Sequence, residues 1–486
     1  MSHREVHLNV NILNAGVFGG SWRFPGTDPV ASLGLEHYLR IARRAEEATF
    51  DAIFLADGPG IRDDLRYRPF NGLEPSVILA AAAAATERVG LIATLSSSYN
   101  DPYDVARRFA TLDLLSGGRS GWNVVTTAGA GPARNFGLDA EPAHAERYRR
   151  AAEFVEVVRA LWNSWEPDAL VGDKGAHRFA DPARIHPVNH TGEFLDVAGP
   201  LNVPRSPQGE PVVVQAGASR DGRALAARIG EVIFTAAQTA DEAGEYYRDV
   251  KARAAAFGRR PEHVLILPGL STVIGSTEAE AEQRRQLLAE LVPPEYALNR
   301  LAEQLGVERE ALVLEAPLPW HLLADPDEAG GSQTFYRIAL GLARRENLTV
   351  RQLLHRLGGG AGHRIVTGTP EQVADAIVDW VDRGIADGFN LMPDVLPGGF
   401  DDFVDGVVPI LRKRGVFRRE YRGSTLRDHL GLPVPRHRSP AAASRSGDAS
   451  GAAGTGPLDG ARVPGAATVR AVDSGAIAAP AAEGAA

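Results

Sequence analysis

Short apolar segments alternate along the chain with segments whose apolar residues recur at helical spacing. Eight apolar segments are predicted strands, at residues 6–13, 52–57, 89–96, 121–127, 211–217, 231–237, 264–275 and 389–395. Most are continuous apolar runs, which is typical of parallel strands covered by helices on the outside. Helical patterns lie between them, at residues 33–48, 74–86, 101–115, 144–165, 219–229, 240–257, 277–291 and 369–384, with a last one at 401–415.

Eight β–α units in one chain predict the α/β class and a (β/α)8 TIM barrel. A doubly wound sheet is disfavoured because GVFGGSWRFPG, after the first strand, lacks the GxGxxG pattern. We expect the barrel to span residues 1–436, with insertions at 167–210 and 292–369. Residues 437–486 contain mostly Ala, Gly, Ser and Pro, so this tail is predicted to be disordered.

Composition narrows the class of protein further. The formal net charge is −9 and the basic residues are scattered, so we expect no nucleic-acid partner and no membrane partner. The chain has no cysteine, which excludes disulfides and thiolate chemistry, and its charged N-terminus does not resemble a signal peptide. We therefore expect a cytoplasmic protein. His186 and His190 lack the HExxH glutamate, so no metal site is predicted.

In a TIM barrel the reactive groups follow the carboxyl ends of the strands. At those positions the chain carries Asp57, Thr94 and Asn123, and then the small residues that precede the helix at 219–229. These are hydroxyls, amides and one carboxylate, with no histidine pair, lysine or carboxylate pair. We name no catalytic residue. Such a set indicates a site that holds a polar cofactor with its own chemistry.

The turn after the fifth strand joins Gly217, Ala218 and Ser219. Ser219 is predicted to cap the helix that follows, and the small residues would let a phosphate approach the free N–H groups of the first turn. The alternative is a serine that only caps its helix. In the helix beginning at residue 144, His144 and Tyr148 lie four residues apart and so on one face. They could contact a phosphate or ribityl chain, or they could simply pack against the barrel.

Several longer strings carry a family resemblance, among them LSGGRSGWNVVTT, AERYRRAAEFVEVVRALW, HPVNHTGEFLDVAGPLNVPRSPQGEPVVVQAGAS and STLRDHLGL. Between about residues 5 and 436 the chain resembles the bacterial-luciferase-like flavin monooxygenases, in the branch of nitrilotriacetate monooxygenase component A. The resemblance implies a two-component monooxygenase. It would take reduced FMN from a separate NAD(P)H:flavin reductase and use dioxygen to oxygenate a small organic substrate: an amine, an aminopolycarboxylate or an organosulfur compound.

The same resemblance implies roles for the candidate residues. Asp57 and Thr94 would lie beside the flavin ring, with Asn123 nearby, while His144, Tyr148 and Ser219 would hold the ribityl phosphate. It also implies a homo-oligomer, either a dimer or a tetramer. Two alternatives stay open: a deazaflavin-dependent dehydrogenase of the same superfamily, and a flavin-binding protein without turnover.

Overall fold

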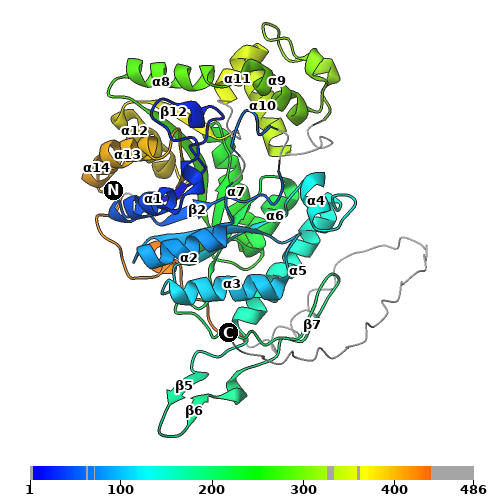
Figure 1. The fold of residues 1–486 in the computed structure, drawn as a ribbon, viewed down its shortest axis with the longest axis vertical. Helices are drawn as coiled ribbons and strands as arrows, with labels where there is room; N and C mark the ends of the chain where they lie inside the picture. The colour runs from blue at the N-terminus through cyan, green and yellow to red at the C-terminus, as the bar shows by residue number, and fades with distance from the viewer. Residues whose placement is uncertain (1–3, 62–63, 70–71, 326–332, 358–361, 439–486) are drawn as a thin grey trace, which may run out of the picture. The chain divides into compact units, whose positions relative to one another are not determined.

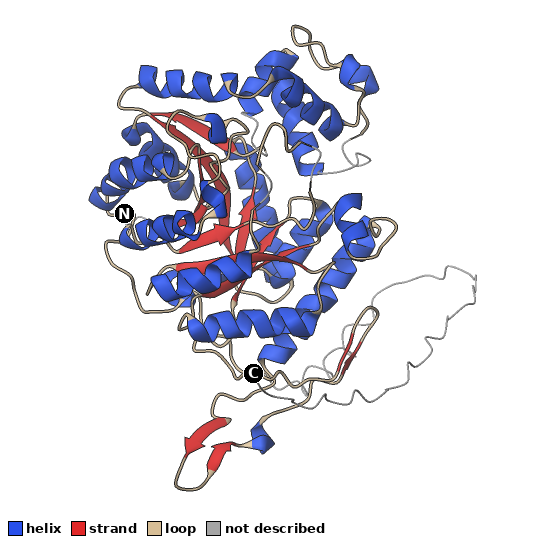
Figure 2. Ribbon diagram, viewed as in Figure 1, coloured by secondary structure: helices blue, strands red, loops and turns tan. Residues whose placement is uncertain are grey.

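Eight parallel strands close into a barrel in the computed structural model (Figure 2). The structure describes residues 4–438 except 62–63, 70–71, 326–332 and 358–361. The barrel strands, in order around the ring, are β1 (His7–Asn11), β2 (Ala52–Leu55), β3 (Gly90–Ser96), β4 (Ser120–Val125), β9 (Val212–Ala216), β10 (Val232–Thr235), β11 (Leu265–Ile274) and β13 (Gly388–Pro393). Pairing of β13 with β1 closes the ring. The predicted (β/α)8 barrel is confirmed, and each predicted strand overlaps one of these eight.

Helices surround the barrel in the order that the sequence predicts. They are α1 (Leu35–Glu47), α2 (Pro75–Ala85), α3 (Pro102–Leu115), α5 (His144–Trp162), α6 (Arg220–Ile229), α7 (Ala240–Ala256), α12 (Pro370–Asp382), α13 (Gly398–Asp402) and α14 (Val408–Lys413), with a π-helical turn at Phe403–Val407. Helix α3 begins where Asp101 accepts the Tyr103 N–H at 2.8 Å and Pro102 sets the first turn. The main core lies between these helices and the outer faces of the strands.

The two insertions leave the barrel at opposite ends (Figure 1). The first follows α5 and so leaves from the amino ends of the strands; it forms the small antiparallel pairs β5 (Leu170–Asp173) with β6 (Arg178–Ala180), and β7 (His190–Thr191) with β8 (Asp196–Val197). The second follows α8 (Glu278–Glu290), in the connection between β11 and the barrel helix α12, and lies at the carboxyl ends, where barrel sites form. Only the second insertion is therefore placed to cover a site.

The second insertion is a helical layer with its own core. It contains α9 (Pro294–Leu305), α10 (Gln333–Glu346) and α11 (Val350–Leu357), preceded by the predicted helix α8 (Glu278–Glu290). Leu301, Tyr336 and Leu353 are among its buried residues. It ends in β12 (Arg364–Gly368), a ninth strand that pairs with β11 outside the ring and that the sequence did not predict. The remaining short elements are α4 (Ala130–Asn135), α15 (Leu426–His429) and single 3-10 turns at Ser21–Arg23, Ala31–Leu33, Pro182–Arg184, Pro261–His263, Arg309–Ala311 and Trp320–Leu322.

The segment after α14 closes the amino-terminal end of the barrel. Leu426, Leu430 and Leu432 pack in one cluster with the inward side chains of the lower barrel, such as Val212 and Leu265. Of the tail predicted from residue 437, the structure describes His437 and Arg438; His437 Nε2 lies 2.8 Å from the Asn163 carbonyl oxygen. The rest of the predicted disordered tail, from residue 439, lies outside the described residues.

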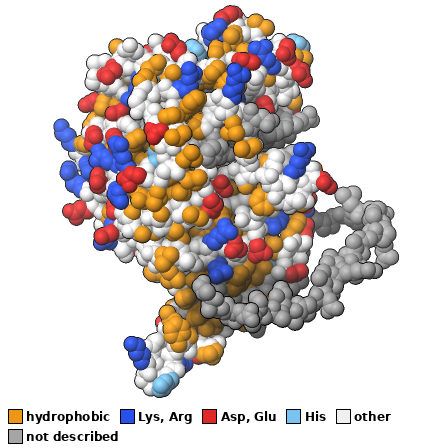
Figure 3. Space-filling model, in the orientation of Figure 1, with side chains coloured by type: hydrophobic (Ala, Val, Ile, Leu, Met, Phe, Trp, Pro, Cys, Tyr) orange, Lys and Arg blue, Asp and Glu red, His pale blue; other side chains and the backbone are white. Residues whose placement is uncertain are grey.

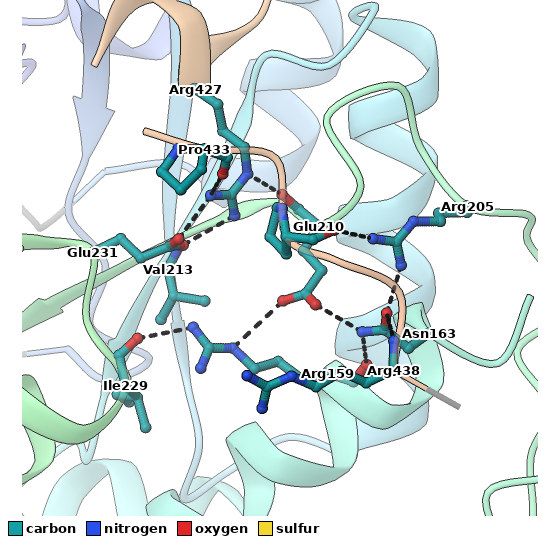
Figure 4. Close-up of polar contacts among 11 residues, drawn as sticks. Arg159, Asn163, Arg205, Glu210, Val213, Ile229, Glu231, Arg427, Pro433 and Arg438 are labelled. Carbon is teal, nitrogen blue, oxygen red and sulfur yellow. Dashed lines mark hydrogen bonds and ion pairs between the residues drawn. The ribbon is translucent and has the colours of Figure 1, made fainter. Parts of the chain in front are cut away.

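A network of buried charges fixes this closing segment (Figure 4). The Arg427 guanidinium, 1% exposed, donates to both carboxylate oxygens of Glu231 at 2.7 and 3.0 Å. Its Nε also donates to the Glu210 carbonyl oxygen at 3.1 Å. The Glu210 side chain accepts from Asn163 at 2.7 Å and lies 3.6 Å from Arg159. The segment is thus joined to β9 and β10 by both apolar packing and ion pairs.

This pair predicts a pH dependence of stability. Burial alone would raise the pKa of Glu231, but the Arg427 charge and its hydrogen bonds lower it to about 2, from an ordinary value of 4.5. A lowered pKa in the folded state means that the stabilisation is present above pH 4.5 and is lost as the pH falls towards 2. The full effect is roughly 3 kcal/mol. Urea unfolding of wild type and Glu231→Gln across this range should give a shallower decline for the variant; parallel curves would contradict the prediction.

Charge on the molecular surface is mixed. On the face in Figure 3, acidic and basic side chains are interspersed between apolar ones. Within the described ranges, every helix is too short or too polar to cross a lipid bilayer.

Candidate active site

The register of the strands defines the layers of side chains inside the barrel. When the register is followed around the eight strands, one layer contains the inward side chains of Phe54, Asn123, Phe234 and Asn390. The layer above it contains Asn11, Thr94, Ala216 and Gly269. The rings of Phe54 and Phe234 meet across the barrel at 5.8 Å, as this assignment requires. Below these layers the interior is apolar except for Asn9. We call the two upper layers the barrel floor; it faces the carboxyl ends of the strands.

The floor contains buried polar atoms without a hydrogen-bond partner. Both side-chain polar atoms of Asn390 are unpaired although the residue is only 1% exposed. In the floor, Asn11 Oδ1 and Asn123 Oδ1 also lack a partner, as do Asn9 Oδ1 in the layer below and the Ser271 hydroxyl nearer the carboxyl ends of the strands. An unsatisfied buried polar group costs about 1–3 kcal/mol. Such a concentration at the carboxyl ends of the strands indicates a surface built to hydrogen-bond a ligand.

Thr94 and Asn123 lie side by side on β3 and β4 and are both almost fully buried. Asn123 Nδ2 donates to Thr94 Oγ1 at 2.9 Å, which leaves Asn123 Oδ1 as an acceptor. Asp57 follows β2 and is half-buried. Burial raises the pKa of its carboxyl group, and the nearby Glu74 charge adds to this effect. The structure therefore brings together the two sequence-predicted residues Thr94 and Asn123, and places Asp57 after the neighbouring strand.

Ser219 caps α6, as the sequence predicts. Its hydroxyl accepts the Gly222 N–H at 3.1 Å. Gly217 has a packing reason to be small, because a Cβ there would lie 2.9 Å from the Gly222 Cα. Its carbonyl oxygen accepts from the Tyr246 hydroxyl at 2.6 Å, and the Ala218 carbonyl accepts from Arg223 at 3.1 Å. The turn is thus held rigidly with the helix N-terminus at its end.

His144 and Tyr148 lie together at the start of α5, with ring centroids 4.7 Å apart. His144 Nδ1 is 3.2 Å from a carboxylate oxygen of Asp221, in the first turn of α6. The N-termini of α5 and α6 are therefore adjacent, which brings His144, Tyr148 and Ser219 to one side of the barrel. Tyr148 also packs against the main core. The Asp221 carboxylate orients the His144 imidazole, a contact that the sequence pattern did not predict.

His363 is a residue of the site that the sequence reasoning missed. It follows α11 and enters the barrel, where its ring stacks on Phe234 at 5.0 Å and 14°. A Cβ on Gly269 would lie 2.2 Å from His363 Nδ1, so the imidazole fills the space that this glycine leaves. Burial lowers the pKa of His363 to about 4, and its Nδ1 has no partner. Gln238 Nε2 holds the segment by donating to the carbonyls of Gly362 and His363 at 2.7 and 3.0 Å.

The sequence contains signals for the inward-facing asparagines that were not among the predicted site residues. In VHLNVNIL the amides Asn9 and Asn11 recur with period two, and FNLMP places Asn390 in an otherwise apolar strand. Polar side chains on the inward face of a barrel strand need a partner. His363 gave a weaker signal, because its position in GGGAGHR resembles a loop.

Among the residues that the structure describes, no three His, Asp or Glu side chains come together to hold a metal ion. His186 and His190 instead pair with separate carboxylates, Glu166 at 2.7 Å and Glu153 at 3.0 Å. Both pairs lie in the first insertion or beside it, away from the carboxyl ends of the strands.

Replacing Asn390, whose side-chain amide is entirely unpaired, tests whether this residue serves ligand binding. Asn390→Leu conserves the size of the side chain and removes two unsatisfied polar atoms, so we expect the ligand-free protein to gain about 1–2 kcal/mol in free energy of unfolding. If the site takes the flavin that the sequence resemblance implies, its affinity for FMN should fall at the same time. Urea unfolding and flavin titration measure the two effects. A variant that loses stability would show that Asn390 has a structural role instead.

Residues 21–387 match the family of luciferase-like monooxygenases. The chain belongs to that family. It is 44% identical over 449 residues to nitrilotriacetate monooxygenase component A of Aminobacter aminovorans. The matched region covers 90% of this chain and 98% of the relative. Among solved structures, EDTA monooxygenase from Chelativorans sp. BNC1 is 39% identical with a TM-score of 0.74, over 88% of this chain and 99% of that one. A riboflavin lyase solved with modified FMN and riboflavin is 35% identical with a TM-score of 0.79, over 90% and 98%.

Proposed function

We propose that this protein is the oxygenase component of a two-component flavin-dependent monooxygenase. It would use reduced FMN from a separate NAD(P)H:flavin reductase, together with dioxygen, to oxygenate a small amine, aminopolycarboxylate or organosulfur compound. The observation that carries the proposal is the barrel floor, where the side-chain amides of Asn11, Asn123 and Asn390 keep unpaired polar atoms near the carboxyl ends of the strands. The names of the relatives support it, and the designation "component A" supports a second, separate component.

The residues fit a flavin. Its ring carries donors and acceptors around one edge, and Asn123 Oδ1 and the neighbouring pair with Thr94 offer complementary groups. Asp57 follows the adjacent strand. His144, Tyr148 and the α6 N-terminus at Ser219 would hold the ribityl phosphate, where the helix dipole favours an anion. Gly217 and Ala218 would leave the backbone of this turn open to the phosphate.

The bound flavin would supply the reaction with dioxygen, which explains why the site lacks a strong acid–base pair. The protein residues would bind, orient and exclude water. The second insertion lies at the same end of the barrel, and His363 carries it into the interior. The His363 imidazole is stacked on Phe234 and has a lowered pKa. It therefore stays neutral at physiological pH and adds no charge to the barrel interior.

Anaerobic titration with reduced and oxidised FMN tests the proposal, followed by mixing the reduced complex with dioxygen in a stopped-flow spectrometer. We expect tighter binding of reduced FMN and a near-ultraviolet absorbance transient that precedes the oxidised spectrum. Equal binding of both forms without a transient would favour a flavin-binding protein without turnover. Binding of a deazaflavin but not FMN would favour a dehydrogenase.

A further inference from the structure

A cavity of about 280 Å³ lies inside the helical layer of the second insertion. It is bounded by the end of α8 and by α9, α10 and α11. Most of its wall is apolar, with Val292, Leu301, Phe335 and Leu354 among the lining side chains. An apolar cavity of about 150 Å³ is enough to bind benzene, so this one accommodates a body larger than a single ring. No residue proposed above to hold flavin lines it.

Within the described residues, the cavity adjoins the barrel at Gly362 and His363. Phe335 lines the cavity, and a Cβ on Gly362 would lie 3.6 Å from its ring. The next residue, His363, is inside the barrel on Phe234. The chain at Gly362 and His363 thus forms the partition between the cavity and the barrel floor. Gln238, after β10, holds this partition through both carbonyl oxygens.

The opposite wall of the cavity contacts loops that leave the carboxyl ends of β1 and β2. Tyr296, which lines the cavity, stacks on Tyr67 at 5.2 Å and lies 3.2 Å from Asp64 through its hydroxyl. Arg23, after β1, donates to the Leu291 carbonyl oxygen at 2.7 Å. The cavity is therefore attached to the face of the barrel that carries the site, and does not lie on a remote surface.

The charges around the cavity indicate the kind of ligand. Arg300 and Arg351 line it together with His355, against the single carboxylate of Glu290. Arg300 lies 3.5 Å from Asp64, with both side chains largely buried. Arg351 pairs with Glu315 at 2.7 Å, but this pair is 46% and 71% exposed. An exposed ion pair contributes little in water, so Arg351 can exchange Glu315 for an acidic group of a ligand.

We propose that this cavity binds the organic substrate as an amphipathic acid, with its apolar body among α9, α10 and α11 and its acidic group at Arg351. The assignment of the ligand as substrate rests on the proposed function. The segment at Gly362 and His363 would then lie between the bound acid and the barrel floor.

Calorimetric titration with 2-naphthoate and with its uncharged isostere naphthalene-2-carboxamide tests the proposal, on the full chain with and without FMN. We expect 2-naphthoate to bind about three- to fivefold more tightly than the amide, as a partly exposed ion pair with Arg351 allows. Arg351→Gln should bring the two affinities within about twofold. The cavity-filling variants Ala297→Phe and Leu354→Trp should each weaken both probes at least tenfold, and Arg309→Gln, an exposed arginine outside the lining, should change neither.

The outcomes separate the parts of the proposal. Equal affinity for acid and amide would overturn the acidic class of ligand. Unchanged binding in both filled variants, or binding of neither probe, would overturn the cavity as a ligand site. Reduced FMN is also titrated into each variant. A protein that binds 2-naphthoate but no flavin would refute the proposed function and leave the ligand site intact.

Discussion

Ser219→Asp is expected to weaken FMN binding about 100-fold or more while leaving the fold intact. Aspartate caps a helix as well as serine does, so α6 keeps its N-terminal hydrogen bond to Gly222. A phosphate beside this residue, however, would meet a new negative charge. Two such charges about 4 Å apart near a protein surface repel by about 4 kcal/mol, and about 2.8 kcal/mol already corresponds to 100-fold in affinity.

Riboflavin and Ser219→Asn provide the matched controls for this prediction. Riboflavin lacks the phosphate, so its affinity should change by less than threefold in Ser219→Asp. Ser219→Asn caps the helix without a charge and should bind FMN within about tenfold of wild type. Fluorescence titration measures all of these affinities. If Ser219→Asp binds FMN as wild type does, the serine only caps its helix and the phosphate lies elsewhere.

Arg427→Met is expected to lower the free energy of unfolding by about 3–5 kcal/mol, since it leaves the carboxylate of Glu231 buried without its partner. Methionine keeps much of the apolar volume, so the loss reports mainly the ion pair and the hydrogen bonds to Glu210 and Pro433. Urea unfolding followed by circular dichroism measures the effect.

Two further variants make the Arg427 result interpretable. Arg422→Met removes a side chain that is 77% exposed and paired with Glu5, and it should cost less than about 1 kcal/mol. The double variant Arg427→Met with Glu231→Gln removes both charges and should be more stable than Arg427→Met alone. A single variant that unfolds like wild type would mean that the apolar contacts of Leu426, Leu430 and Leu432 suffice to hold the closing segment.

The candidate site could be predicted only in part. Thr94 and Asn123 were expected from their positions at strand ends, and the structure joins them by a hydrogen bond. His144, Tyr148 and Ser219 were expected on separate helices, and the contact of His144 with Asp221 brings those helices together. Asn390 and His363 were not predicted. An amide in an apolar strand is a local signal for Asn390, but nothing near either residue in the sequence indicates which strands it will face. The roles towards a flavin of all eight candidate residues stay predictions: Asp57, Thr94, Asn123, His144, Tyr148, Gly217, Ala218 and Ser219.

By itself, the sequence determined the alternation of eight strands with helices and hence the closed barrel, because apolar periodicity is a local property that each segment carries alone. It also placed the polar residues at the strand ends. The tertiary structure alone decided which insertion covers the site, which amides share the barrel floor, and that His363 lies on Phe234 above Gly269. These features depend on the stagger of strands around a closed barrel and on packing between residues far apart in the sequence, such as Phe234 and His363. No local pattern specifies them.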